Sequence, residues 1–487
     1  MVKRTVVLFF SLFLFFAVPE SKSFGEEAVR LSLSDCLNIA LADNIDIKIA
    51  KIEARMAEQN VLIAESVFDA LIAGKTTYSD DQRASPSPLM GTKTITTEYG
   101  AGISKELPTG TEVSIDYLDT REWTDRLFTD LNPFHEAGLS FTLRQPVLKN
   151  FFGYVDRSSV RLSKIEANMA DLKALNRIEN TIAEIEKAYW YLVFTYQDVS
   201  LREGLLREAT ELYELFKKHL KTGLVEETEL YETEANMRTR KAVLLVSRNN
   251  LVTASNNLKL LLNEEGDFTI MPVDRLETFG EKADLVKSMN EAFISNREYR
   301  IKKKELVAKK VTLSMKENSL WPVVDLVGTY SINGIARKTQ KANRDITAEN
   351  NPLYYGGVEF RIPIENRDAR GEYEKAKLEK KKVVLELIYV EKDIATLIDE
   401  KVRNVNLYLE NAKRWALIKE IQYRKFRDQE KKLKYGRSSS KDVVDYQNDF
   451  TLAALREYDA ILEYYDALID LENAKDTLLA KVGVLSR

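Results

Sequence analysis

Cysteine, histidine, proline and glycine are all scarce in this chain of 487 residues. The single cysteine, Cys36, excludes an intramolecular disulfide and a cysteine-rich metal centre, and two histidines argue against a histidine-based metal site. Ten prolines and 19 glycines permit long uninterrupted helices. Basic residues (72) do not exceed acidic ones (76), so nothing indicates a nucleic-acid partner. These shortages disfavour most enzyme classes, and we expect no cofactor and no bound metal.

No apolar run in the chain reaches the length of about 18 residues that a membrane-spanning helix needs. The apolar run at 6–18 follows two basic residues and precedes a plausible cleavage site at Ser23-Phe24-Gly25, which is typical of a secretory signal peptide. A buried N-terminal helix is the alternative. We therefore expect residues 1–25 to be cleaved on export, with no lipid anchor because no cysteine follows the run. Within a membrane, the rest would have to form a closed β-barrel, since backbone groups must be satisfied there.

A helix and then several strands are predicted in the first part of the chain. Apolar residues recur at three- and four-residue steps over 33–66, after Ser34 as a candidate N-cap. Between about 69 and 147, Thr, Ser, Gly and Tyr become frequent and apolar residues alternate with polar ones, which predicts two to four strands. Pro108-Thr109-Gly110 is a turn signal that predicts a hairpin over 95–119.

Two long helices follow the strands. Residues 154–221 contain no proline and one glycine, and their apolar residues alternate four- and three-residue steps, as in a coiled-coil seam. At 1.5 Å per residue this helix would be about 100 Å long. A second helix is predicted over 226–262, and residues 263–280 resemble a linker.

The same order of elements then returns, which predicts two tandem structural repeats, 26–262 and 281–487. The second repeat has a helix, strands, a polar loop and two long helices, over 283–317, about 321–364, 333–352, 370–434 and 441–482. The distance from Pro146 to Gly223 is 77 residues, and that from Pro363 to Gly436 is 73. These two distances differ by about one helical turn, and such agreement is hard to obtain by chance.

The alternating strands suit a wall with lipid on one side and water on the other. An ordinary half-buried sheet alternates in the same way and is the alternative. Four strands, or six if the 95–119 hairpin joins, are too few to enclose a water-filled pore. Closure would require several chains, and three chains would supply 12 or 18 strands. The helices could likewise surround a hollow or form a solid coiled-coil bundle.

Several segments together resemble the TolC family of outer-membrane efflux proteins. These are the opening Leu-Ser-Leu-Ser-Asp-Cys-Leu-Asn-Ile-Ala-Leu-Ala-Asp-Asn at 31–44, the strand ends Gln145-Pro146-Val147-Leu148 and Ile362-Pro363-Ile364, and two helix–Gly–helix turns. The resemblance implies a mainly α-helical chain with a membrane β part: a TolC-like homotrimer whose β-barrel continues into a long α-helical coiled-coil barrel. It further implies an outer-membrane location with a large periplasmic part, and no catalytic residues.

The resemblance also implies partners and a site. The family gives substrates a passive exit duct in multidrug efflux or type I secretion, together with a periplasmic adaptor and an inner-membrane pump. Its periplasmic entrance lies at the two turns. Two groups of residues match there: the entrance residues Asp442, Asp445, Thr228 and Glu229, and the adaptor-contacting residues Thr222, Gly223, Leu224, Tyr435, Gly436 and Arg437.

Each of these site assignments has a simpler alternative. Asp442 and Asp445 are three apart and share a helix face, so a trimer would stack two carboxylate rings in a narrow mouth. Alternatively, Asp442 caps the start of its helix. Gly223 and Gly436 could be plain helix C-caps. A family arginine that latches the closed mouth aligns with Ser438, one position from Arg437.

The main competing function is an exported periplasmic coiled-coil adaptor or scaffold without a pore. Such an adaptor typically has one helical hairpin between β-rich domains, whereas two strand sets are predicted here. An exported enzyme is the third hypothesis, but neither a phosphate-binding loop nor a His/Cys cluster is found in the sequence. The sequence does not indicate the cargo, the pump or the adaptor.

Overall fold

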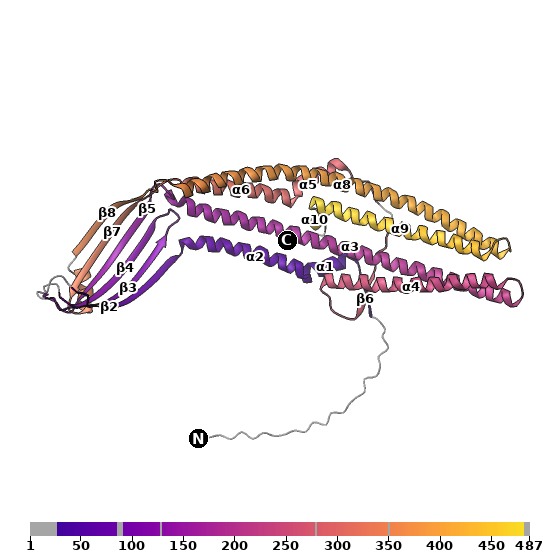
Figure 1. The fold of residues 1–487 in the computed structure, drawn as a ribbon, viewed down its shortest axis with the longest axis horizontal. Helices are drawn as coiled ribbons and strands as arrows, with labels where there is room; N and C mark the ends of the chain where they lie inside the picture. Colours follow the sequence, from indigo (N-terminus) through magenta and orange to yellow (C-terminus); the bar gives the residue numbers. More distant parts are fainter. Residues whose placement is uncertain (1–26, 85–90, 127–128, 278–279, 349–350, 482–487) are drawn as a thin grey trace, which may run out of the picture.

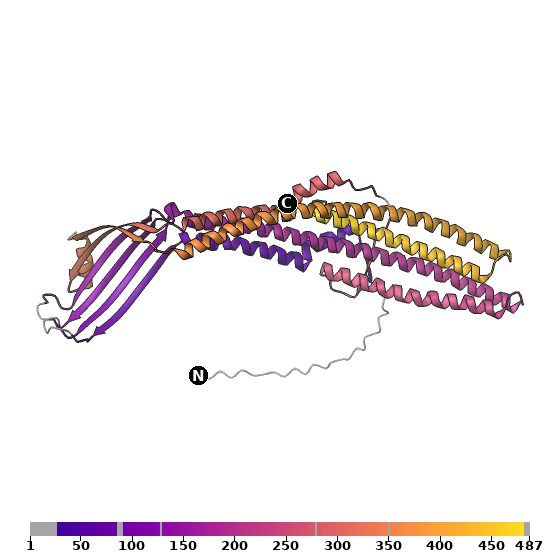
Figure 2. The ribbon, with the colours of Figure 1, turned by 45° about the horizontal axis from the view of Figure 1, so that its top comes forward.

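The computed structural model describes residues 27–84, 91–126, 129–277, 280–348 and 351–481. The predicted signal peptide, 1–25, lies outside these residues. The chain is elongated, with a β-sheet at one end and two helical turns at the other (Figures 1 and 2). Among the described residues, we find no helix that is both long and apolar enough to cross a bilayer.

The sheet has six antiparallel strands, in the order β2-β3-β4-β5-β7-β8. Their bounds are Ala70–Asp81, Thr94–Glu106, Glu112–Thr124, Phe134–Pro146, Val323–Ala336 and Asn351–Arg361. The hairpin predicted over 95–119 forms β3 and β4. It joins the other strands, because β3 pairs with β2 along its length. The contact between β5 and β7 joins the two halves of the chain in one sheet.

One face of the sheet is mainly apolar and the other is mainly polar, although the second face also exposes Leu71, Leu118, Ile335, Leu353 and Tyr355. The apolar face carries exposed hydrophobic side chains that the register places in cross-strand rows: Ile72, Tyr99, Ile103, Ile115, Leu139, Phe141, Leu143, Leu326, Tyr330, Tyr354, Val358 and Phe360. On the polar face, Arg144 binds Asp325 (3.0 Å) and Glu359 (2.8 Å). This separation follows from the two-residue period of the strands.

The predicted polar loop at 333–352 is wrong in part. Strand β7 continues to Ala336, and residues Thr339–Ala348 form a helix, α7, before β8 begins. Ala342 and Ile346, one helical turn apart, are buried together with Ala137 and Ala336. Burial of this small apolar cluster stabilises a helix too short to persist alone.

Two pairs of helices have equal lengths in the two halves of the chain. Helices α3 (Tyr154–Lys221) and α8 (Arg367–Lys434) have 68 residues each, and α4 (Glu227–Leu262) and α9 (Ser440–Lys475) have 36 each. The predicted seams are buried, with Ile182 and Ile185 of α3 and Ile398 and Val405 of α8 at 0% exposure. At 1.5 Å per residue, α3 and α8 are each about 100 Å long.

The continuous helices predicted over 33–66 and 283–317 are each broken at an asparagine. The first becomes α1 (Leu33–Asp43) and α2 (Ile45–Glu65), followed by the short η1 (Ser66–Phe68). The second becomes α5 (Leu285–Ser295) and α6 (Arg297–Asn318). The Asn44 and Asn296 side chains accept hydrogen bonds from backbone N–H groups three residues later, both at 2.9 Å, and so start new helices.

Three further predictions are wrong in detail. Ser32, not Ser34, caps α1, because Ser32 and Asp35 form a capping box. The linker at 263–280 contains a strand, β6 (Phe268–Pro272), which pairs in parallel with β1 (Glu27–Leu31). The helix predicted over 441–482 ends at Lys475 because Asp476 is left-handed (φ 57°), and α10 (Leu478–Lys481) follows.

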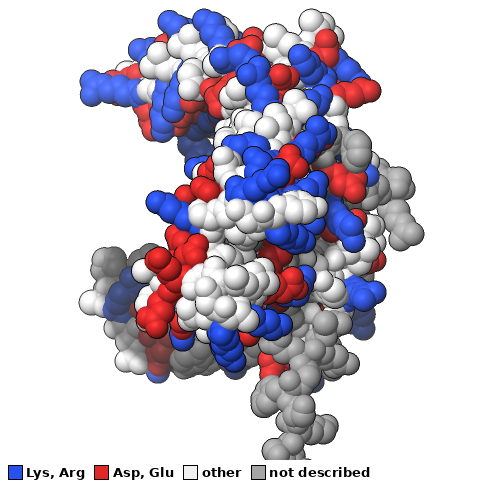
Figure 3. Space-filling view, turned by 90° about the vertical axis from the view of Figure 1, so that its right-hand side faces the viewer, with Lys and Arg blue, Asp and Glu red and all other residues white. Residues whose placement is uncertain are grey.

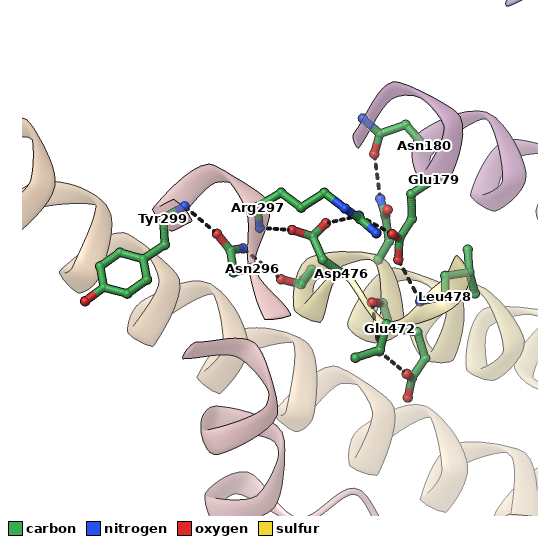
Figure 4. A network of polar contacts seen from close by, with 11 residues as sticks. Glu179, Asn180, Asn296, Arg297, Tyr299, Glu472, Asp476 and Leu478 are labelled. Atoms are coloured by element: carbon green, nitrogen blue, oxygen red, sulfur yellow. Dashed lines mark hydrogen bonds and ion pairs between the residues drawn. The ribbon is translucent and has the colours of Figure 1, made fainter. Parts of the chain in front are cut away.

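A buried ion cluster joins the two halves of the chain (Figure 4). The Arg297 guanidinium binds Glu179 and, at 3.2 Å, Asp476, and all three residues are less than 10% exposed. Glu179 also accepts a hydrogen bond from the Leu478 backbone N–H at 2.6 Å. The cluster therefore ties α3 to the start of α6 and the end of α9.

Candidate functional site

The two tip turns, residues 222–226 and 435–439, have the same backbone design. Leu224 N–H donates to His219 O at 3.0 Å, and Arg437 N–H donates to Lys432 O at 2.9 Å, each across five residues. Gly223 (φ +71°) and Gly436 (φ +68°) occupy the left-handed position of this Schellman motif. The C-cap alternative is thus realised at both glycines, and their role in contacting a partner stays a prediction.

The outermost side chains at the tip turns are exposed and include large apolar groups. Leu224 is 71% exposed and Tyr435 is 80% exposed, and Thr222 and Arg437 are also exposed. Lysines occupy the last turns of both α3 and α8, where they complement the helix dipole. Figure 3 looks onto this end, where basic and acidic side chains are both on the surface. Each turn thus presents one large apolar side chain to water.

Asp442 belongs to the capping box that starts helix α9, in which Ser439 is the N-cap residue. Its carboxylate accepts hydrogen bonds from the Ser439 hydroxyl (2.8 Å) and the Ser439 backbone N–H (3.2 Å). In return, Ser439 Oγ accepts from Asp442 N–H at 3.1 Å, which completes a capping box. These bonds from Ser439 hold the pKa of the Asp442 carboxyl below its usual value, so it is ionised at neutral pH.

The remaining entrance residues lie near the starts of α4 and α9, the helices that follow the two tip turns. Asp445 is exposed one turn along α9 from Asp442. Thr228 is exposed and Glu229 is half-buried in the first turn of α4, where no side chain caps the helix at Glu226. A single chain cannot form a ring, so the carboxylate ring stays a prediction that depends on assembly.

Polar contacts that the sequence did not indicate join the two helical hairpins behind the tip turns. Ser440 Oγ donates to Glu232 (2.9 Å), and Gln447 Nε2 donates to Glu208 (3.2 Å). Arg240 donates to Asn448 at 2.7 Å. These bonds connect α9 to α3 and α4, so the two hairpins are held side by side as one unit.

A groove of about 310 Å³ lies beside these contacts, between α3 and the α8–α9 hairpin. Its lining includes Glu208, Glu211, Phe426, Arg427, Glu430 and Gln447. Burial raises the pKa of Glu430, opposed by Arg427 at 2.7 Å and reinforced by the nearby carboxylates of Glu208 and Glu211. The groove thus has three glutamates, two basic residues (Arg427 and Lys434) and Phe426 in its lining, and Glu430 and Glu208 already have partners within the chain. No group of three or more potential metal ligands is found among the described residues.

The fold is shared with solved structures of bacterial outer-membrane channels. CusC, studied for its folding and transmembrane channel formation, is 12% identical (TM-score 0.69), with 94% of this chain and 95% of CusC covered. The Neisseria gonorrhoeae MtrE outer membrane channel in its open state is 14% identical (TM-score 0.67), with 91% and 88% covered. The Campylobacter jejuni CmeC outer membrane channel is 15% identical (TM-score 0.66), with 91% and 85% covered.

At these identities the likeness shows the fold alone. No family model and no curated protein matches the sequence. The TolC-like fold implied by the sequence resemblance is confirmed.

Proposed function

We propose that this chain is one third of a TolC-like outer-membrane channel, a passive exit duct for efflux or type I secretion. The observation that carries the proposal is the apolar sheet face: a six-stranded sheet exposes mainly hydrophobic side chains on one side and mainly polar ones on the other, and no second sheet covers it among the described residues. A large exposed apolar surface of this kind marks a membrane or protein contact. The attached helices, about 100 Å long, suit a duct that continues from the membrane into the periplasm.

Three copies would form the wall of the duct. Each sheet has two unpaired edges, at β2 and β8, and an edge strand is costly unless it is paired. Pairing β8 of one copy with β2 of the next would close a homotrimeric β-barrel of 18 strands, in the range that leaves an aqueous pore. The apolar face would then contact outer-membrane lipid, and the polar face would line the pore.

The helical end would provide the partner site and the entrance. In this proposal a periplasmic adaptor contacts the tip turns at Leu224 and Tyr435, and the adaptor links the channel to an inner-membrane pump. The equal helix lengths in the two halves support an origin by tandem duplication. A cleaved signal peptide at 1–25 would export the chain. The duct itself needs no catalysis, because the pump supplies the energy.

Extraction and gel analysis test this proposal against the adaptor-like scaffold. We expect the mature protein to fractionate with the outer membrane, to require detergent for extraction, and to migrate as a trimer that dissociates on heating. The scaffold alternative would instead give a protein that is released without detergent and remains folded in plain buffer.

The proposed entrance ring predicts a change in ion selectivity. In Asp442→Asn/Asp445→Asn, three chains together lose six carboxylates, so the preference of the channel for cations should decrease. Asn can still accept the capping hydrogen bond at 442, so the fold should be kept. Reversal potentials in a KCl gradient measure the preference.

The matched control is Asp393→Asn/Glu400→Gln, which removes two exposed carboxylates from α8, far along the chain from the turn. Equal selectivity in both double variants and the unmodified protein would remove the ring and leave the fold and the channel intact.

A further inference from the structure

Helix α7 lies on the apolar face of the sheet, at the end remote from the long helices. A side chain added at Gly334 of β7, which belongs to that face, would meet Ala342 O of α7 at 2.2 Å. Tyr117, on the same face of β4, donates to Asn343 of α7 at 2.7 Å. The helix is therefore packed directly against the face that we propose enters lipid.

The helix covers polar groups that would otherwise interrupt that face. Asp119 is 3% exposed and lies 3.1 Å from His135 Nδ1, and Thr339 at the start of α7 is 3.0 Å from the same nitrogen. Since unpaired polar groups are costly in a hydrocarbon layer, this row marks where the lipid-facing surface ends. Helix α7 thus lies at the level of the lipid headgroups on the side opposite the helical end.

The outer side of α7 is basic. Lys341 and Arg344, three residues apart, share an exposed side of the helix, and the exposed Arg337 and Lys338 directly precede its first residue, Thr339. Asp345 is the acidic residue within 337–348, and it is buried. Basic residues at the start of a helix oppose its dipole, so stability of α7 does not account for Lys338 and Lys341. Arg337 also donates to the Asp130 backbone carbonyl at 3.1 Å, which fixes one end of the group.

We propose that α7 and the two residues before it form an interfacial segment whose four basic residues, Arg337, Lys338, Lys341 and Arg344, bind the phosphate-bearing headgroups of anionic lipids at the far membrane surface. The inference rests on the proposed function, because it requires the apolar face to be in lipid. Ala342 and Ile346 pack on Ala137 and Ala336, so the sheet holds the segment in place, and a fixed cluster of basic residues at an anionic membrane surface attracts its headgroups. Lipid, rather than a soluble anion, is the ligand that this position favours.

Native mass spectrometry of the full-length trimer tests the proposal, with phosphatidylglycerol and phosphatidylcholine as probes. The unmodified protein should retain phosphatidylglycerol in preference to phosphatidylcholine. In the variant Arg337→Gln/Lys338→Gln/Lys341→Gln/Arg344→Gln, phosphatidylglycerol binding should be at least roughly tenfold weaker, because each basic residue near an anionic surface contributes to binding. A matched control removes four exposed lysines from α8: Lys375→Gln/Lys377→Gln/Lys381→Gln/Lys382→Gln.

The outcomes separate this proposal from the proposed function. A trimer in which both variants bind phosphatidylglycerol as the unmodified protein does would overturn the role of α7 and leave the channel standing. Displacement of bound phosphatidylglycerol by millimolar inorganic phosphate would also overturn the proposal, because the four basic residues would then bind anions in general. Absence of any trimer would instead contradict the proposed function.

Discussion

Replacing Arg297 with methionine should destabilise the protein by about 3–5 kcal/mol, because it leaves the buried carboxylate of Glu179 without its cation. Glu179 is 0% exposed, and its hydrogen bond from Leu478 N–H cannot neutralise a buried charge. Urea unfolding of the detergent-solubilised protein, followed by circular dichroism, measures the loss. The loss should be large because the cluster joins three helices that are far apart in sequence.

Two further variants make this prediction specific. Arg177→Met removes the same charge from a site that is 41% exposed and paired with Asp46 and Glu53, so it should cost less than about 1 kcal/mol. Arg297→Met/Glu179→Gln should recover part of the stability, since the amide oxygen still accepts from Leu478 N–H without a buried charge. Equal stability of Arg297→Met and Arg177→Met would show that the buried cluster contributes no more than an exposed ion pair.

A charge in the middle of the apolar sheet face should prevent stable insertion into the membrane. Phe141 lies between Ile115 and Tyr330 in one cross-strand row and is 39% exposed. Phe141→Arg should cost about 2–4 kcal/mol per chain if this row lies near the centre of the bilayer. The yield of heat-dissociable trimer in the outer-membrane fraction measures the effect.

The neighbouring residue provides the control for this prediction. Ser140 points to the opposite, polar face of the same strand, so Ser140→Arg should leave the trimer yield nearly unchanged. The reverse order, with Ser140→Arg the more damaging, would mean that the polar face contacts lipid and that the proposed orientation of the sheet is inverted.

The sequence predicts the long elements well because their signals are local and repeated. The bounds of α3 agree with the predicted 154–221, since proline is absent over that stretch and Gly223 ends the helix. The alternation of Leu139, Phe141 and Leu143 likewise predicts which residues share a face of β5.

The missed features depend on contacts between distant residues. Glu179 meets Arg297, 118 positions away, and no local pattern specifies that pairing. Glu186, seven residues after Glu179 on α3, is also buried. Two glutamates spaced by seven residues beside the apolar seam were the sequence signal that could have indicated buried carboxylates. The breaks at Asn44 and Asn296 were missed because the apolar period continues across both residues. At the candidate site, Ser439 and Asp442 have the three-residue spacing of a capping box, which favours the capping alternative.

The single-channel conductance of the purified trimer in a planar lipid bilayer tests the central claim most directly. We predict uniform conductance steps, because three chains would complete one water-filled duct with a fixed cross-section. Folded protein that never conducts, and that has the mass of a single mature chain without detergent, would contradict the account.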